Sequence, residues 1–194
     1  MNRVRLLAFL LAVSLPTTAL AWQDGDESKC PARGTYRNAD YRFRVRIPVG
    51  LSGCPNSPVG MSDHGVYVPL AGKGVPRSIE AFGAYETFDH ATPTAAAVQG
   101  VESAREDAAP GTFMAESPRT GRLSGLASAR VVVRYTDRET GRAVVRDDTY
   151  VLRPAGPGKG GIARAYIVSL VTTPEDYEAD RAVFEKVLAS WKVF

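Results

Sequence analysis

Apolar and polar side chains alternate in several short segments of this chain, and this alternation limits the folds open to it. The clearest segment is residues 41–47, where arginines separate aromatic and aliphatic side chains. A period of two predicts a β-strand with one buried face. Similar alternation, or a short apolar run, predicts further strands at 66–70, 78–88, 112–116, 122–126, 129–135, 143–152 and 162–171.

Two helices are predicted from their starting residues and from helical spacing. Thr92 and Pro93 have the residue types of an N-cap and a first helical position, and Pro110 ends the run that follows. Thr173 and Pro174 repeat this start. The apolar stripes are Ala97, Val101, Ala104 and Ala108 in the first helix and Tyr177, Phe184, Val187, Leu188 and Trp191 in the second.

The order of these elements predicts the fold class. Strands are followed by a helix, several more strands and a final helix, which indicates an α+β fold with helices against a mainly antiparallel sheet. The thin, alanine-rich stripe of the first helix favours a position on the sheet. Residues 167–171 form the most apolar stretch of the predicted strands, so we expect them in the central strand.

The N-terminal residues predict export. Residues 1–21 contain a positive start, an apolar run over 6–15 and small residues at Ala19 and Ala21, the three parts of a secretory signal. We expect cleavage before Trp22 and a soluble periplasmic or secreted product. A membrane anchor is the alternative, but about ten apolar residues fall short of the roughly 20 that span a bilayer. No later segment is apolar enough to span one.

Signal removal changes the charge balance of the chain. The full sequence has 24 Lys+Arg and 21 Asp+Glu residues. Arg3 and Arg5 leave with the signal, so 22 minus 21 gives a net charge of +1. This balance gives no reason to expect a nucleic-acid partner.

Cys30 and Cys54 are the only cysteines of the sequence. An isolated pair in an exported protein predicts a disulfide, whose loop of about 25 residues is worth roughly 3 kcal/mol in the chain-entropy model. The bond would tie a flexible segment, residues 22–35, to a single domain over residues 36–194. A nucleophilic or metal-binding thiol would need partners that are not nearby in the sequence.

Three segments resemble the PsbP-like superfamily, which includes DcrB- and LpqN-type bacterial envelope proteins. Residues 41–48 resemble that group's first strand ending in Pro, and residues 123–133 resemble its entry from Gly into an apolar strand. Residues 167–193 resemble its final strand, helix and short apolar tail. The resemblance covers 36–194 and implies a three-layer α/β/α sandwich with binding or assembly work and no shared catalytic residues. The cysteine pair, a long Gly/Pro loop after the first strand and the lack of a lipid-attachment cysteine depart from the pattern.

Signals for a metal or nucleotide site are weak. His64 and His90 are the only histidines, and neither has the spacing of a metal motif. Each follows an aspartate, so two His-Asp pairs could form a weak divalent site if their loops met; solvated loop residues are the simpler interpretation. The glycine-rich run 156–161 lacks the Ser/Thr and the following helix of a phosphate-binding loop. We expect no cofactor and no metal.

Signals for catalysis are equally weak. Ser52 and Ser124 lie near glycines, but neither spacing matches a nucleophile elbow, and both sites read better as turns. Asp147 and Asp148 are adjacent on a predicted strand, so their side chains point to opposite faces and cannot act on one atom. Pairing across the hairpin with Arg130 or Arg134 explains them more simply.

Two surface features are candidates for binding a partner. Arg42, Arg44 and Arg46 would share one face of the first strand, where guanidinium groups favour carboxylates; a solvated face is the alternative. The loop 51–65, with Asp63 and His64, is the second candidate, against the alternative of a plain connector.

We therefore predict an exported, non-catalytic periplasmic domain that binds another protein. It would serve as an envelope accessory or assembly factor, or as an immunity protein against a secreted toxin. A carrier of a small apolar or lipid ligand, held in a deep apolar cavity, is the second hypothesis. A hydrolase with a dispersed site is the third.

Overall fold

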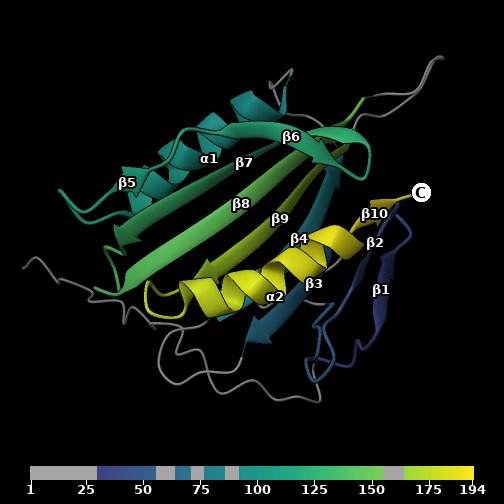
Figure 1. The fold of residues 1–194 in the computed structure, drawn as a ribbon. Coiled ribbons are helices and arrows are strands. Elements are labelled where there is room, and N and C mark those ends of the chain that lie inside the picture. Colours follow the sequence, from purple (N-terminus) through teal and green to yellow (C-terminus); the bar gives the residue numbers. More distant parts are fainter. Residues whose placement is uncertain (1–29, 56–63, 71–76, 86–91, 155–163) are drawn as a thin grey trace, which may run out of the picture.

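The computed structural model describes residues 30–55, 64–70, 77–85, 92–154 and 164–194, and it is an α+β structure (Figure 1). These residues form two helices and ten strands. Their bounds are β1 (Thr35–Asn38), β2 (Phe43–Arg46), β3 (Gly65–Leu70), β4 (Arg77–Tyr85), α1 (Pro93–Asp107), β5 (Met114–Ala115), β6 (Arg119–Leu123), β7 (Leu126–Thr136), β8 (Ala143–Arg153), β9 (Arg164–Thr172), α2 (Tyr177–Ser190) and β10 (Lys192–Val193).

The strands form two antiparallel sheets. The large sheet has the order β3-β4-β9-β8-β7-β5, with β6 also paired to β7. The small sheet has the order β1-β2-β10. The prediction that 162–171 holds the central strand is confirmed, since β9 lies between β4 and β8 in the large sheet.

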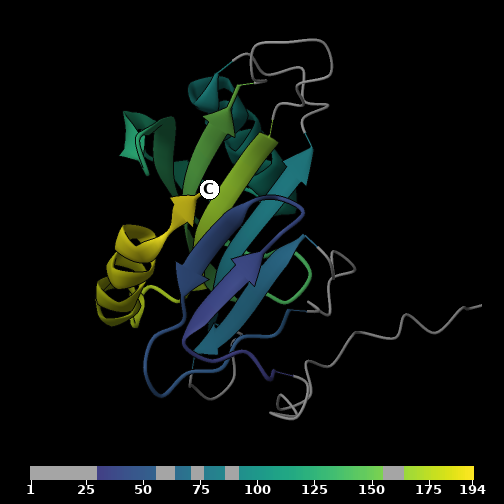
Figure 2. The same ribbon diagram turned by 90° about the vertical axis from the view of Figure 1, so that its right-hand side faces the viewer.

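The helices cover opposite faces of the large sheet, which makes a three-layer α/β/α sandwich (Figures 1 and 2). Alternation along the strands supplies an apolar core on each face. Val131 and Val133 pack on the α1 side with Ala97 and Ala104, whereas Val132 packs on the α2 side. The small sheet lies on the same side as α2 and contributes Phe43 and Val45 to that core, and Ile47 joins them just after β2. The predicted fold class is confirmed.

An aromatic cluster joins the small sheet, α2 and the large sheet. The Trp191 ring, which is fully buried, stacks on Phe43 of β2 with 6.2 Å between ring centroids. It also meets the edge of Tyr166 of β9 at 5.1 Å. The Tyr166 hydroxyl donates to the Tyr41 carbonyl oxygen at 2.8 Å, so the cluster ends in a satisfied hydrogen bond.

The second helix begins later than the sequence pattern predicts. Thr173 and Pro174 precede it as a turn, in which the Thr173 Oγ1 accepts from the Asp176 N–H at 3.2 Å. α2 starts at Tyr177. The first helix starts as predicted, because Pro93 is its first residue and the Thr92 Oγ1 accepts from the Ala95 N–H at 3.2 Å.

Short edge elements also differ from prediction. β1 and β10 were not predicted, and β1 begins at Thr35, within the segment expected to be flexible. Between α1 and β7, the strands are Met114–Ala115 and Arg119–Leu123 instead of 112–116 and 122–126. Two or five residues give too short a pattern to fix a register.

The predicted disulfide between Cys30 and Cys54 is present. Both cysteines are buried against Tyr67 of β3, and Cys54 forms an antiparallel bridge with that residue. Ala32 pairs with Gly53 in the same way. The disulfide therefore holds the residues before β1 beside the loop that follows β2.

In the part of the chain that the structure describes, neither helix has the length and apolar character required to cross a bilayer.

The aromatic cluster generates a stability prediction. Trp191→Ala removes a fully buried indole and should lower the free energy of unfolding by about 3–5 kcal/mol in urea denaturation. Trp191→Phe should cost clearly less, because the Trp191 Nε1 has no hydrogen-bond partner among the described residues to lose. Equal losses for the two variants would contradict the packing role given to the ring.

Candidate binding site

A groove of about 1200 Å³ separates β2 from the side of α2. Its apolar lining comes from Val45 of β2, Leu70 of β3 and Val183 of α2. The turn after β2 adds Val49, which is fully exposed, and Leu51. Val45 itself is buried, whereas Leu51, Leu70 and Val183 are partly exposed. Partly exposed apolar side chains inside a concave surface are typical of a binding site.

Four basic side chains line the same groove without a counter-charge. They are Arg44, Arg46, Lys186 and Lys192. All four are exposed, and none forms an ion pair with a described residue. A fifth basic residue of the groove, Arg77, is neutralised by acids. Its Nη1 lies 2.6 Å from the Asp176 carboxylate and 3.5 Å from the Asp180 carboxylate. The groove thus carries about four uncompensated positive charges.

Local structure fixes the direction of these cations. Arg44 and Arg46 alternate with the buried Phe43 and Val45, so both point away from the core. The Arg46 N–H donates to the Ser190 Oγ at 2.9 Å, which attaches the end of α2 to β2. Two of the three predicted arginines are therefore brought to the groove.

Arg42 does not follow the predicted alternation. It lies in the turn before β2 with a left-handed φ of 57°, and its carbonyl oxygen accepts from the Phe194 N–H at 3.0 Å. This backbone turn takes Arg42 out of the strand, and it is not among the residues that line the groove. A period-two pattern cannot reveal such a turn.

His64 lies away from the groove and is held by the fold. Its Nε2 is 3.2 Å from the Tyr41 hydroxyl, and its Nδ1 is 3.1 Å from the Gly83 carbonyl oxygen. With a proton on Nδ1, the ring donates to Gly83 and accepts from Tyr41. Gly83 makes this approach possible, since a Cβ there would lie 2.6 Å from the Tyr41 Cβ. His64 is thus a packed structural residue, not a solvated one.

Asp63, His90 and the glycine-rich run 156–161 lie outside the described residues. The binding role predicted for Asp63 and the possible pairing of the two His-Asp sequences therefore remain predictions.

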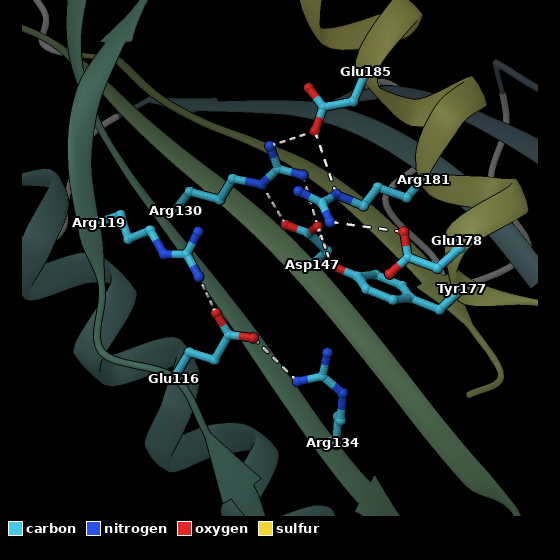
Figure 3. A network of polar contacts seen from close by, with 9 residues as sticks. All are labelled: Glu116, Arg119, Arg130, Arg134, Asp147, Tyr177, Glu178, Arg181 and Glu185. Atoms are coloured by element: carbon cyan, nitrogen blue, oxygen red, sulfur yellow. Dashed lines mark hydrogen bonds and ion pairs between the residues drawn. The ribbon is translucent and has the colours of Figure 1, made fainter. Parts of the chain in front are cut away.

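A network of charged residues lies on the opposite side of α2, between that helix and β5, β6 and β7 (Figure 3). Its centre is Asp147, which is fully buried. Arg130 Nε and Nη2 donate to the two Asp147 carboxylate oxygens at 2.6 and 2.7 Å, and the Tyr177 hydroxyl donates at 2.9 Å. The predicted pairing of Asp147 with Arg130 across the hairpin is confirmed.

The outer part of this network is a balanced surface. Arg130 also donates to Glu185 at 2.7 Å, and Arg134 contacts Glu116 at 3.2 Å. Figure 3 contains four arginines and four carboxylates, so the charges cancel within the network. Unlike the groove, this surface has no excess charge that a partner would need to neutralise.

Burial and the nearby Asp147 carboxylate raise the pKa of Tyr177 to about 12. The hydroxyl therefore keeps its proton and remains a hydrogen-bond donor at neutral pH. The hydrogen bonds to Asp147 also raise the pKa of Arg130 above its ordinary value. Both shifts are consequences of a fixed ion pair, and both move the pKa away from neutral pH, where a group that transfers protons would need it.

Asp148 faces the α1 side, as the alternation predicts. Its carboxylate accepts from Arg146 of the same strand at 2.9 Å, and not from Arg130 or Arg134 across the hairpin as predicted. A second cleft, of about 260 Å³, lies nearby between α1, β8 and β9, with Gln99, Ser103 and Tyr150 among its lining residues. This cleft is small and partly polar, unlike the deep apolar cavity that a lipid carrier would need.

The described residues bring together no catalytic constellation. Ser124 sits in the two-residue turn between β6 and β7 with a φ of 53°, and its Oγ accepts from the Val193 N–H at 3.2 Å. The prediction of a turn at this serine is confirmed. Within the described ranges, no group of three metal-ligating side chains is found.

Sequence reasoning missed Lys186 and Lys192. Lys186 is one turn of helix from Val183, so its position on the polar edge of α2 was readable from helical spacing. Lys192 belongs to a two-residue strand whose partner, Arg44, lies far away in the sequence. No local signal indicates that pairing.

Comparison with known proteins identifies the fold. No protein-family model matches the sequence, and no curated protein sequence matches it. Among solved structures, LpqN of Mycobacterium tuberculosis, described as involved in cell envelope biogenesis, has a TM-score of 0.59 at 13% identity, over 78% of this chain and 82% of that one. Cyanobacterial PsbP of Synechocystis has a TM-score of 0.53 at 14% identity, over 82% and 91% of the two chains.

A third similar structure is the Ran-binding protein Mog1p of Saccharomyces cerevisiae. It has a TM-score of 0.52 at 12% identity, over 84% of this chain and 96% of that one. These identities establish the fold alone, and the fold is PsbP-like. The resemblance in three sequence segments is confirmed at the level of architecture.

The charged network generates the next prediction. Arg130→Ala leaves Asp147 buried without its cation and should lower the free energy of unfolding by about 3–5 kcal/mol. Arg181→Ala is the matched control, because Arg181 is more exposed and lies 3.8 Å from Glu178 and from Glu185. Arg181→Ala should lower the free energy of unfolding by less than about 1 kcal/mol. Chemical denaturation of both variants gives the comparison.

Glu80 of β4 generates a prediction about pH. Burial raises the pKa of Glu80 above its ordinary value, and Asp148 adds to this effect. The folded state thus holds this proton more tightly than the unfolded chain, so the ionised side chain lowers stability above its folded pKa. Glu80→Gln should raise the free energy of unfolding at pH 7, and the gain should vanish as pH falls below about 4.3. Denaturation of the wild type and of Glu80→Gln at both pH values gives the comparison.

Proposed function

We propose that this PsbP-like chain is an exported, non-catalytic domain that binds another protein in the bacterial envelope, through the groove between β2 and α2. Either an accessory role in envelope assembly or neutralisation of a secreted toxin as an immunity protein would use such a site.

The uncompensated charge of the groove carries this proposal. Arg44, Arg46, Lys186 and Lys192 surround accessible apolar side chains and have no ion pair with a described residue. The nearby Arg77 and the more distant Arg130 are, by contrast, each paired with an aspartate, Arg77 with Asp176 and Arg130 with Asp147. Charged side chains around an apolar centre are typical of protein interfaces, where complementary charges steer association.

Two further observations support a non-catalytic role. His64 uses both ring nitrogens in contacts with Tyr41 and Gly83, so it is not positioned as a general base for a nucleophile. The buried carboxylates Asp147 and Asp148 are each paired with an arginine and point to opposite faces of the sheet. A hydrolase with a dispersed site therefore gains no support from the described residues.

The envelope location is supported by independent features. Residues 1–21 have the pattern of a secretory signal, and the disulfide between Cys30 and Cys54 fits an oxidising compartment. LpqN, which shares the fold, is described as involved in envelope biogenesis. The alternative of a lipid carrier gains less support, because the cleft beside α1 is small and partly polar.

Crosslinking in intact cells tests this proposal. The tagged wild-type chain is crosslinked, purified and analysed by quantitative mass spectrometry beside the variant Arg44→Glu/Arg46→Glu/Lys186→Glu. We expect a specific envelope protein to be recovered with the wild type and to fall at least tenfold with the variant, because charge reversal repels a complementary partner.

A control variant separates charge from position. Arg119→Glu/Arg122→Glu/Arg142→Glu makes the same change of charge at exposed positions on β6 and before β8, away from the groove, and among the described residues it breaks only the exposed ion pair of Arg119 with Glu116. It should recover the partner as well as the wild type does. Equal losses for both variants, or recovery that survives groove reversal, would remove the groove from the proposal.

A further inference from the structure

Three cations lie side by side across the outer face of the small sheet. Arg44 of β2 is the direct cross-strand partner of Arg37 of β1 on one side and of Lys192 of β10 on the other. Direct partners in an antiparallel sheet have Cα atoms about 4.5–5.5 Å apart and point to the same face. The row therefore holds three positive side chains at the spacing of adjacent strands.

Such a row opposes the stability of the sheet. Like charges that lie directly opposite each other destabilise a strand pair. All three side chains are exposed, and none has an ion pair with a described carboxylate. Arg37 instead lies over the Phe194 ring, with 3.8 Å from its guanidinium carbon to the ring centroid. An anion bound on this face would supply the missing attraction.

The row continues into the groove. Arg44 and Lys192 belong to both, and Arg46 and Lys186 extend the positive surface along the groove. The full chain has a formal net charge of only +3, so five cations gathered on one surface are a local concentration and not a general property of the chain. The field of this surface selects a negatively charged partner.

The shape of the surface distinguishes between kinds of anion. A lipid bilayer presents a flat surface of headgroups, whereas this site is concave and is lined by the partly exposed Leu51 and Val183. An extended protein segment can enter a groove and place an apolar side chain against these residues. Two of the groove's cations are arginines, whose planar guanidinium groups match carboxylates.

The spacing of Arg44 and Arg46 indicates how acidic residues would be spaced in a partner segment. Two residues along a strand are about 6.5 Å apart and share a face. An extended segment with carboxylates at positions i and i+2 has the same repeat, with its intervening side chains on the opposite face. Such a segment can direct its acids to the arginines while an apolar residue enters the groove.

We propose that the groove and the adjoining row bind an extended, acidic protein segment in which Asp or Glu residues alternate with apolar residues. The inference rests on the proposed function and specifies the chemistry of its partner. Arg44 and Arg46 bind successive carboxylates, Lys192 and Arg37 bind an acid beside them, and Val183 and Leu51 contact an apolar side chain.

Fluorescence anisotropy with synthetic peptides tests this inference. The probe is a labelled nonapeptide with three glutamates at alternate positions and valine or leucine between them; a second peptide has three glutamates at every third position. Protein expressed from the full chain should bind the first peptide at least tenfold more tightly than the second. Affinity should fall steeply between 50 and 300 mM salt, concentrations chosen to span weak and strong screening.

Charge reversal locates the binding. Arg44→Glu/Arg46→Glu should weaken binding of the alternating peptide at least tenfold, whereas Arg122→Glu/Arg142→Glu should leave it unchanged. All four arginines are exposed, and circular dichroism will confirm that both variants remain folded. Equal affinity for the two peptides, or equal losses in the two variants, would overturn the inference.

Vesicles containing phosphatidylglycerol complete the test. Binding to vesicles without binding to either peptide would overturn the protein-segment inference and assign the surface to a membrane. If cellular crosslinking depends on the groove but neither peptide binds, the proposed function stands and the acidic chemistry of its partner is wrong. If both experiments fail, both proposals fail.

Discussion

The packing of Trp191 against Phe43 and Tyr166 is the interaction on which the rest of this structure depends. It connects the residue after α2, a strand of the small sheet and the central strand of the large sheet in one buried cluster. The small sheet has only short strands, which rarely hold together on their own. With Trp191 in place, β2 and α2 are fixed at a separation that leaves the groove between them.

The charged side chains on the two sides of α2 differ in whether they are paired. On one side, Arg130 and Tyr177 donate hydrogen bonds to the buried Asp147 carboxylate, and the positive and negative charges around them cancel (Figure 3). On the other side, Arg44, Arg46 and Lys186 face solvent with no described counter-charge. A helix that is anchored by a neutral network on one side can present a charged site on its other side without moving.

The sequence predicts the parts of this fold whose signals are local. Alternation placed Phe43, Val45 and Ile47 in the core, and the Thr92-Pro93 pair located the start of α1 correctly. Thr173-Pro174 has the same residue types, and Thr173 Oγ1 also accepts from the N–H three residues on, but there the bond closes a turn and α2 begins only at Tyr177. The same local hydrogen bond therefore does not fix where a helix starts. Arg44 and Arg46 were identified as binding candidates, whereas their position beside Lys186 and Lys192 depends on pairing between distant segments that no local pattern encodes.

Most of the groove lining comes from residues 35–51 and 180–192, which lie at opposite ends of the domain sequence, and Leu70 and Arg77 add to it. During synthesis, the residues of β2 leave the ribosome long before those of α2. A partial product of translation or proteolysis that ends before α2 lacks Lys186 and Lys192 and has only one wall of the groove. The proposed binding surface therefore forms only when both segments are present and folded, so a partner would bind the complete folded domain and not a fragment.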